Sequence, residues 1–293
     1  MRYVIITPAK NEAALIGYVL ESVSLQSRQP VEWIIVDDGS IDDTVRVAAG
    51  YAERFPWIRV VPRPMASEAR RGGANVVGAF YDGLRALRTN DYEVIVKLDA
   101  DLTIPRDYFK EVLNCFGQDP QVGLCGGYLV EESGVIGRRE RTAGYHVRGA
   151  LKAYRRSCFE KIGGLQPVHL WDSVDEFTAM QMGWSVRVLP IAVVHHRQTS
   201  AATNRGLSGL HYEGRAYYRI GHTVPLCLGR GLLVGLRRSP LLVSGLAFAA
   251  GSVLARLRRE QLVVSEDLAR FIRLYQYGRL RRRILGRAAS PTT

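Results

Sequence analysis

Short apolar runs alternate with segments of helical length over the first two thirds of the chain. In residues 12–26, for example, Ala13, Ile16, Leu20 and Val23 recur at the spacing of one helical face. The segments expected as helices are 12–26, 41–54, 74–88 and 107–116, and the apolar runs expected as strands are 3–7, 31–36, 58–61, 92–98 and 122–129. This alternation predicts an α/β fold in which helices cover a largely parallel sheet.

The pattern changes in the last third of the chain. Before the change, the sequence predicts a short helix over 175–182 and a strand over 186–194. Beyond Asn204, arginine-bearing amphipathic segments surround an uncharged stretch over 241–255. Its 15 residues are fewer than the roughly 20 that a helix needs to cross a bilayer. We therefore expect an α/β domain over 1–204 and a helical extension over 205–293.

The net charge of +12 belongs to the extension. Residues 1–204 hold 24 basic and 24 acidic side chains, whereas 205–293 hold 16 arginines against 4 acidic residues. A basic, amphipathic segment of this kind is typical of peripheral attachment to an anionic membrane surface. The alternative is that the helices pack their apolar faces onto the α/β domain or onto a second copy in a homo-oligomer.

Cysteine usage and the N-terminal segment bear on the compartment. The four cysteines show neither the spacing of a zinc site nor the density of a disulfide scaffold; they are Cys115, Cys125, Cys158 and Cys227. The first apolar run is interrupted by Thr7 and Pro8, too early for the core of a signal peptide. We expect a cytoplasmic protein, held peripherally on the cytoplasmic face of the membrane.

Two clusters of acidic residues follow predicted strands, VDDGS at 36–40 and KLDAD at 97–101. In open α/β sheets, ligands bind beyond the carboxyl ends of the strands, so acids from separate strands can converge on one ligand. Asp38 is placed to accept a hydrogen bond from a nucleotide base or a ribose hydroxyl. Asp99 and Asp101, two positions apart in extended chain, can face one Mg²⁺ or Mn²⁺ ion. The simpler interpretation is two solvated turns, which favour Asp, Gly and Ser.

A third acidic segment, WDSVDE at 171–176, offers a general base. Asp175 and Glu176 are expected to begin a helix, where acids commonly cap and complement the helix dipole. Asp172 precedes that helix beside Trp171, and partial desolvation there would raise its proton affinity. Asp172 is therefore the predicted base and Asp175 its rival.

These motifs occur in a specific order over residues 1–200. TPAKNE at 7–12 is followed by VDDGS, LDAD, a Gly163-Gly164 turn, the WDSVDE segment that leads to Gly183-Trp184, and VVHHR at 193–197. The set resembles the inverting family 2 glycosyltransferases of the GT-A fold, a Rossmann-like, mostly parallel mixed sheet with helices on both faces. In the usual acceptor-side motif of that family a Glu precedes the catalytic Asp, and Trp171 stands in its place here.

The resemblance implies roles for particular residues. The nucleotide pocket would be lined by Thr7, Pro8, Ala9, Glu12, Asp38 and Lys97. Asp99 would contact the ribose or sugar and share the metal, and Asp101 would be the main metal ligand. Of the two adjacent histidines at the end of the last strand, His195 and His196, at most one can face the metal or diphosphate, since strand neighbours point to opposite faces; we assign His195.

The expected activity is transfer of a hexose from a nucleotide-diphosphate sugar to an acceptor hydroxyl. The reaction would be a single displacement with inversion, in which Asp172 takes the proton and Mg²⁺ or Mn²⁺ stabilises the leaving diphosphate. A saccharide or lipid-linked acceptor in bacterial polysaccharide or glycolipid synthesis is expected. A sugar nucleotidyltransferase is the alternative, although residues 7–13 lack the glycines of its phosphate loop. Nucleic-acid binding is not expected, because the basic extension has no stacking array or reading motif.

Overall fold

The chain divides into two compact units, Met1–Gln198 and Thr199–Thr293. The computed structural model describes residues 1–63, 72–131, 138–139, 144–196, 206–236 and 238–284. The expected boundary between residues 204 and 205 lies outside the described residues and stays a prediction.

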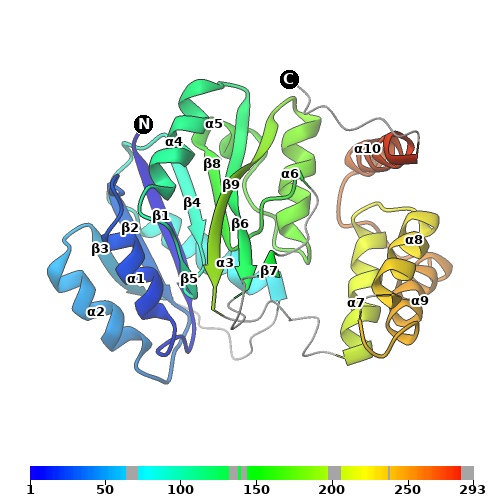
Figure 1. The fold of residues 1–293 in the computed structure, drawn as a ribbon, viewed down its shortest axis with the longest axis horizontal. Coiled ribbons are helices and arrows are strands. Elements are labelled where there is room, and N and C mark those ends of the chain that lie inside the picture. Colours follow the sequence, from blue (N-terminus) through cyan, green and yellow to red (C-terminus); the bar gives the residue numbers. More distant parts are fainter. Residues whose placement is uncertain (64–71, 132–137, 140–143, 197–205, 237, 285–293) are drawn as a thin grey trace. The chain divides into compact units, whose positions relative to one another are not determined.

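A mixed sheet is the frame of the first unit (Figure 1). Its strands lie in the order β3-β2-β1-β4-β8-β6-β9-β5, and β7 pairs with β6 at the side. The strands β3, β2, β1 and β4 are parallel, whereas β8 runs antiparallel to both of its neighbours, β4 and β6. The strand bounds are β1 Tyr3–Ala9, β2 Glu32–Asp37, β3 Ile58–Pro62, β4 Val94–Leu98, β5 Leu102–Thr103, β6 Val122–Glu131, β7 Arg138–Arg139, β8 Leu151–Arg155 and β9 Ser185–His195.

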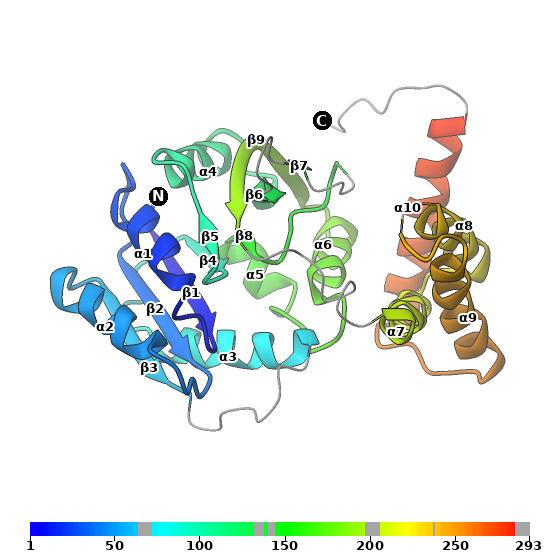
Figure 2. The same cartoon turned by 60° about the horizontal axis from the view of Figure 1, so that its bottom comes forward.

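Helices cover both faces of this sheet, as Figure 2 shows. Successive residues of a strand point to opposite faces, so Ile5 and Ile35 enter one buried cluster while Ile6 and Ile34 enter the other. On the first face lie α1 Ile16–Ser24, α2 Thr44–Arg54 and α4 Tyr108–Gln118; on the second lie α3 Gly72–Ala86, α5 Arg156–Lys161 and α6 Trp171–Gln181. The predicted α/β class is confirmed.

Several elements of this unit differ from the prediction, and the short strands β5 and β7 are among those that were not expected. The strand β8 and the helix α5 were not expected, because Lys152, Arg155 and Arg156 interrupt the apolar pattern that identifies buried elements. The helix α6 begins at Trp171, four residues earlier than expected, after Leu170 in a left-handed conformation with φ 63°. Asp172 therefore lies in the first turn of α6 rather than on its approach.

Four helices make up the described part of the second unit. They are α7 Gly206–Arg219, α8 Val224–Gly235, α9 Val243–Leu257 and α10 Glu266–Ile284. Among the described residues, every helix is too short or too polar to span a bilayer.

Candidate active site

The loops after β1 and β2 are joined by hydrogen bonds at the carboxyl edge of the sheet. The backbone N–H of Asp38 donates to the carbonyl of Ala9 (2.9 Å), and the N–H of Glu12 donates to Oγ1 of Thr44 (2.7 Å). Asn11 has a φ of 53° and its side-chain oxygen accepts from the N–H of Ile41. The predicted nucleotide residues Pro8, Ala9, Glu12 and Asp38 are therefore held together at one edge.

Two of the predicted nucleotide residues have protein partners that sequence reasoning missed. Thr7 is fully buried and its Oγ1 accepts from the indole N–H of Trp33 (2.9 Å), so its side chain belongs to the core. The Asp38 carboxylate accepts from Nη1 of Arg63 (2.9 Å), and Nε of Arg63 donates to Asp82 (2.8 Å). Because Arg63 follows β3, Asp38 is fixed by the neighbouring strand rather than left as a solvated turn.

The second acidic cluster lies in the turn between β4 and β5. Asp99 forms an ion pair with the buried Lys97. The buried Asp101 lies 3.2 Å from Nε2 of His195, and its carbonyl accepts from the N–H of His196. Ala100 and Asp101 lie in a turn rather than in extended backbone. The geometric reason given for the convergence of Asp99 and Asp101 was therefore wrong.

The structure nevertheless brings Asp101 to His195, 94 positions away in the chain. Pairing of β5 with β9 places Leu102 opposite His195 and fixes the contact. The His196 ring stacks on Tyr18, with the two ring centroids 3.9 Å apart. The side chains of the two histidines therefore point in different directions, as predicted. Among the described residues, no three His, Cys, Asp or Glu side chains are grouped to hold a metal ion. The Asp101–His195 pair supplies one carboxylate and one imidazole, which are donors that suit Mn²⁺ when diphosphate and water complete its shell.

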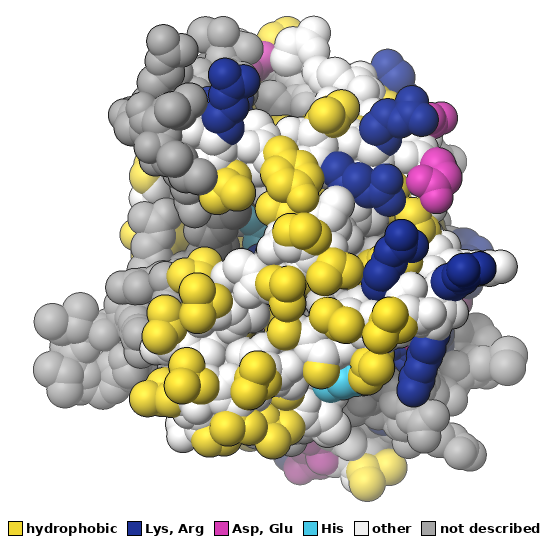
Figure 3. Space-filling view, turned by 90° about the vertical axis from the view of Figure 1, so that its right-hand side faces the viewer, with side chains coloured by type: hydrophobic (Ala, Val, Ile, Leu, Met, Phe, Trp, Pro, Cys, Tyr) yellow, Lys and Arg dark blue, Asp and Glu magenta, His cyan; other side chains and the backbone are white. Residues whose placement is uncertain are grey.

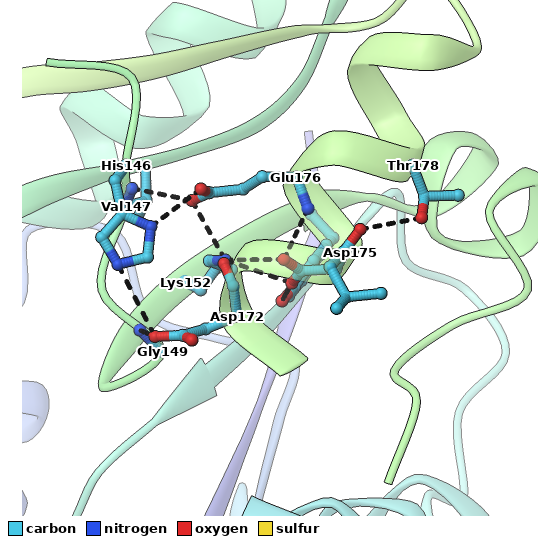
Figure 4. A network of polar contacts seen from close by, with 10 residues as sticks. His146, Val147, Gly149, Lys152, Asp172, Asp175, Glu176 and Thr178 are labelled. Atoms are coloured by element: carbon cyan, nitrogen blue, oxygen red, sulfur yellow. Dashed lines mark hydrogen bonds and ion pairs between the residues drawn. The ribbon is translucent and has the colours of Figure 1, made fainter. Parts of the chain in front are cut away.

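The third acidic segment is built into a buried polar network (Figure 4). Lys152, on β8, has no exposed side-chain surface, and its Nζ lies 2.9 Å from Asp175 and 3.1 Å from Glu176, both also fully buried. His146 lies on the other side of the network. Its Nδ1 is hydrogen-bonded to Glu176 (2.8 Å), and its Nε2 makes a longer ion-pair contact of 3.7 Å with Asp172. The network fixes the first two turns of α6 against β8.

Asp172 and Asp175 differ in accessibility. The Asp172 side chain is 19% exposed, whereas that of Asp175 is 0% exposed. The Asp175 carboxylate also accepts hydrogen bonds from the Tyr154 hydroxyl (2.5 Å) and from Nζ of Lys152. The Asp172 carboxylate is therefore accessible from solvent, whereas the Asp175 carboxylate is enclosed.

The charges around the two carboxyls set their pKa values in opposite directions. Burial would raise the pKa of Asp172, but His146, Lys152 and Arg148 outweigh it and hold that pKa below its usual range. The expected rise in the proton affinity of Asp172 was therefore wrong. Burial raises the pKa of Asp175 to about 6 despite the opposing charge of Lys152. At neutral pH, Asp172 is a carboxylate ready to accept a proton.

Asp172 and the turn that contains Asp99 are linked through a short stretch of backbone. The N–H of Gly149 donates to the Asp172 carboxylate (3.4 Å), while the carbonyl of the next residue, Ala150, accepts from the N–H of Asp99 (2.7 Å). Trp171 lies between two lysines that are paired across β4 and β8: its ring centroid is 5.6 Å from Nζ of Lys97 and 5.7 Å from Nζ of Lys152. The residues predicted to contact the donor and the predicted base are thus connected through neighbouring contacts.

Comparison with solved structures identifies the class of fold. The mannosyltransferase PcManGT of Pyrobaculum calidifontis, solved with GDP-Man and Mn²⁺, is 21% identical with a TM-score of 0.57 and covers 96% of this chain and 80% of its own. TarS of S. aureus, solved with UDP-GlcNAc, is 12% identical with a TM-score of 0.55. The match covers 90% of this chain and 93% of the TarS chain. The first unit has the GT-A glycosyltransferase fold that the sequence predicted.

The family follows from the sequence matches. The model of Glycosyl transferase family 2 matches residues 4–169, more than half of the chain, so the chain belongs to this family. The O-antigen chain rhamnosyltransferase RfbN of Salmonella typhimurium is 25% identical over 67% of this chain and 66% of its own length. The 4,4'-diaponeurosporenoate glycosyltransferase of Staphylococcus aureus is 34% identical over 41% of this chain and 29% of its own length. The matches thus span less than two thirds of either relative.

Proposed function

We propose that the protein transfers a hexose from a nucleotide-diphosphate sugar to an acceptor hydroxyl, with inversion at the anomeric carbon. The observation that carries the proposal is the environment of Asp172. It is an ionised, partly exposed carboxylate in the first turn of α6, fixed by His146 and by the backbone of Gly149. The positive end of the helix dipole adds to the preference for its charged form.

The donor would lie across the carboxyl edge of β1, β2 and β4. Asp38 and the loop that contains Ala9 and Glu12 would contact the nucleoside, and Lys97 and Asp99 would contact the phosphates, ribose or sugar. Asp101 with His195 would hold Mg²⁺ or Mn²⁺, with the diphosphate and water completing the shell of the ion. A divalent cation there supplies positive charge that stabilises the leaving diphosphate.

The chain's own contribution to the chemistry is proton removal and orientation. The acceptor oxygen forms a bond to the anomeric carbon while the bond from that carbon to the diphosphate oxygen breaks, and the hydroxyl proton passes to Asp172. Attack from the face opposite the leaving group inverts the configuration. Asp175 does not take this proton, because its carboxylate is enclosed by Lys152 and Tyr154.

The acceptor class is supported by the relatives. One is named for the O-antigen chain and another for 4,4'-diaponeurosporenoate, which favours a saccharide or lipid-linked acceptor in bacterial polysaccharide or glycolipid synthesis. Solved neighbours carry GDP-Man and UDP-GlcNAc, so a hexose on either nucleotide is a reasonable first donor.

The test is a screen of UDP-, GDP- and dTDP-hexoses with Mn²⁺ or Mg²⁺. Release of the nucleoside diphosphate from one donor is expected, and NMR of the transferred sugar should show the anomeric configuration opposite to that of the donor. A product with retained configuration would contradict the displacement. Pyrophosphate released from a nucleoside triphosphate and a sugar phosphate would instead identify a nucleotidyltransferase.

A further inference from the structure

The helices α8 and α9 turn their leucines outward. Leu232 and Leu246 are 61% and 68% exposed. Their neighbours in these helices and the connecting loop are exposed as well: Leu228, Leu233, Leu236, Leu241, Leu242 and Leu257. Figure 3 shows the result, hydrophobic side chains gathered over the face that carries α8 and α9. We call this set of leucines the leucine face. An exposed apolar patch this extensive is typical of a binding surface.

Small residues, rather than leucines, fill the interface between these helices. A Cβ added at Gly245 of α9 would lie 2.4 Å from the carbonyl oxygen of Gly231 and 2.9 Å from Cα of Gly235, both on α8. On the other side of α9, a Cβ at Gly251 would lie 1.9 Å from the carbonyl oxygen of His211 on α7. Phe248 of α9 is buried against Tyr217 of α7, but the leucines of α8 and α9 point outward. Close glycine contacts combined with outward leucines are typical of helices packed in lipid.

Arginines border the leucine face on one side (Figure 3). Arg238, Arg256, Arg258 and Arg259 are all exposed, and no acidic residue occurs between residues 224 and 259. The next acid, Glu260, is only 15% exposed and is paired with Arg215 at 2.7 Å. A second copy docked here would bring two arginine-bordered faces together, and residues 224–259 of neither copy would supply an acid to pair with the arginines of the other. A layer of anionic lipid headgroups complements both the arginines and the leucines.

We propose that α8 and α9 dock in the plane of an anionic bilayer surface, with the leucine face at the headgroup–acyl boundary and the bordering arginines among the phosphates. The 15 residues of α9 reach about 22 Å at 1.5 Å per residue, less than the roughly 30 Å hydrocarbon core, so the helix lies in the interface. The proposal does not depend on the sugar-transfer reaction.

The test measures binding of the full-length protein to vesicles of phosphatidylglycerol or phosphatidylcholine by flotation, without any sugar donor. Binding to phosphatidylglycerol is expected, and Leu232→Asp/Leu246→Asp should weaken it ten-fold or more because each leucine loses its apolar insertion. Leu25→Asp, in the first unit, is the matched control, since Leu25 is also 61% exposed, and it should bind as the wild type does. Arg258→Ser/Arg259→Ser should weaken binding to phosphatidylglycerol vesicles by roughly five-fold per arginine. Binding to phosphatidylcholine vesicles should not change.

Three results would overturn the proposal. The first is absence of the wild-type protein from floated anionic vesicles, and the second is equal binding of the double aspartate variant and the wild type. The third is a lipid-free dimer that Leu232→Asp/Leu246→Asp dissociates, because a second copy would then occupy the leucine face. Activity on a soluble acceptor is scored separately, so failure of either proposal is recognisable without the other.

Discussion

Replacing Lys152 by methionine tests whether the network beneath α6 holds the base in place. Lys152 is fully buried and is the cation shared by Asp175 and Glu176. Methionine keeps most of the volume but removes the charge, leaving two buried carboxylates in need of other partners. Breaking a buried ion pair from one side typically costs about 3–5 kcal/mol of unfolding free energy.

The contacts that remain place the loss near the lower end of that range. Asp175 keeps the Tyr154 hydroxyl and the N–H of Glu176, and Glu176 keeps His146 and the N–H of Val147. We therefore expect Lys152→Met to lower the free energy of unfolding by about 3 kcal/mol at pH 7.5. A domain stable by roughly 5–15 kcal/mol would still fold, so the loss is measurable by urea titration.

The loss should shrink in acid. With its pKa raised to about 6, Asp175 binds a proton more tightly in the folded protein than in the unfolded chain, so its contribution to stability is present at acid pH and is lost as pH rises through about 6. Lys152 opposes that rise, so its removal moves the pKa of Asp175 further upward. For each unit by which the pKa of Asp175 rises, the free energy of unfolding of the variant increases by about 1.4 kcal/mol once the carboxyl is protonated.

Two comparisons make this prediction refutable. Lys110→Met, at an exposed position of α4, should change the unfolding free energy by less than about 0.5 kcal/mol. Adding Asp175→Asn to Lys152→Met should recover about 1 kcal/mol or more, because one uncompensated charge disappears. A Lys152→Met loss below about 1 kcal/mol, or one independent of pH between 5 and 7.5, would show that Lys152 does not stabilise the buried carboxylates as proposed.

Three further predictions concern other parts of the molecule. His146→Gln should move the acid limb of the kcat/KM profile to higher pH, because His146 lowers the pKa of Asp172; an unmoved limb would show that the two side chains are not coupled. Asp101→Asn should weaken Mn²⁺ binding by ten-fold or more in a paramagnetic titration, and equal affinity would remove Asp101 from the metal site. Gly245→Val should lower the Tm of the second unit through a cost of about 1–3 kcal/mol, since its Cβ would meet the Gly231 carbonyl at 2.4 Å; an unchanged Tm would contradict the close helix packing.

The sequence predicted the elements whose burial follows a simple period. The strands β1, β2 and β4 and the helix α1 were expected because their apolar residues recur at strand or helix spacing. The strand β8 was missed, because Lys152 and Arg155 have the appearance of surface residues although Lys152 is fully buried. Only its partners on α6, about 20 positions later in the chain, account for its burial.

Site residues that belong to a sequence motif could be predicted, whereas residues that matter only through their contacts in space could not. Asp101 and His195 were singled out and are found together, since strand ends meet at one edge of a sheet. His146 and Arg63 carry no motif of their own, and their importance comes from carboxylates 30 and 25 positions away. The pKa of Asp172 was expected to rise because desolvation beside Trp171 was visible in the sequence while the surrounding cations were not.

In the proposed reaction Asp172 removes the acceptor proton, and other residues of the site hold the donor. The most direct measurement compares Asp172→Asn with the wild type in turnover and in donor affinity, the second by calorimetry with the nucleotide-diphosphate sugar and Mn²⁺. We expect kcat to fall by about 10²–10⁴-fold while donor affinity stays within about two-fold of the wild type. Turnover that survives the substitution, or that is lost only because the donor no longer binds, would contradict the proposed role of Asp172.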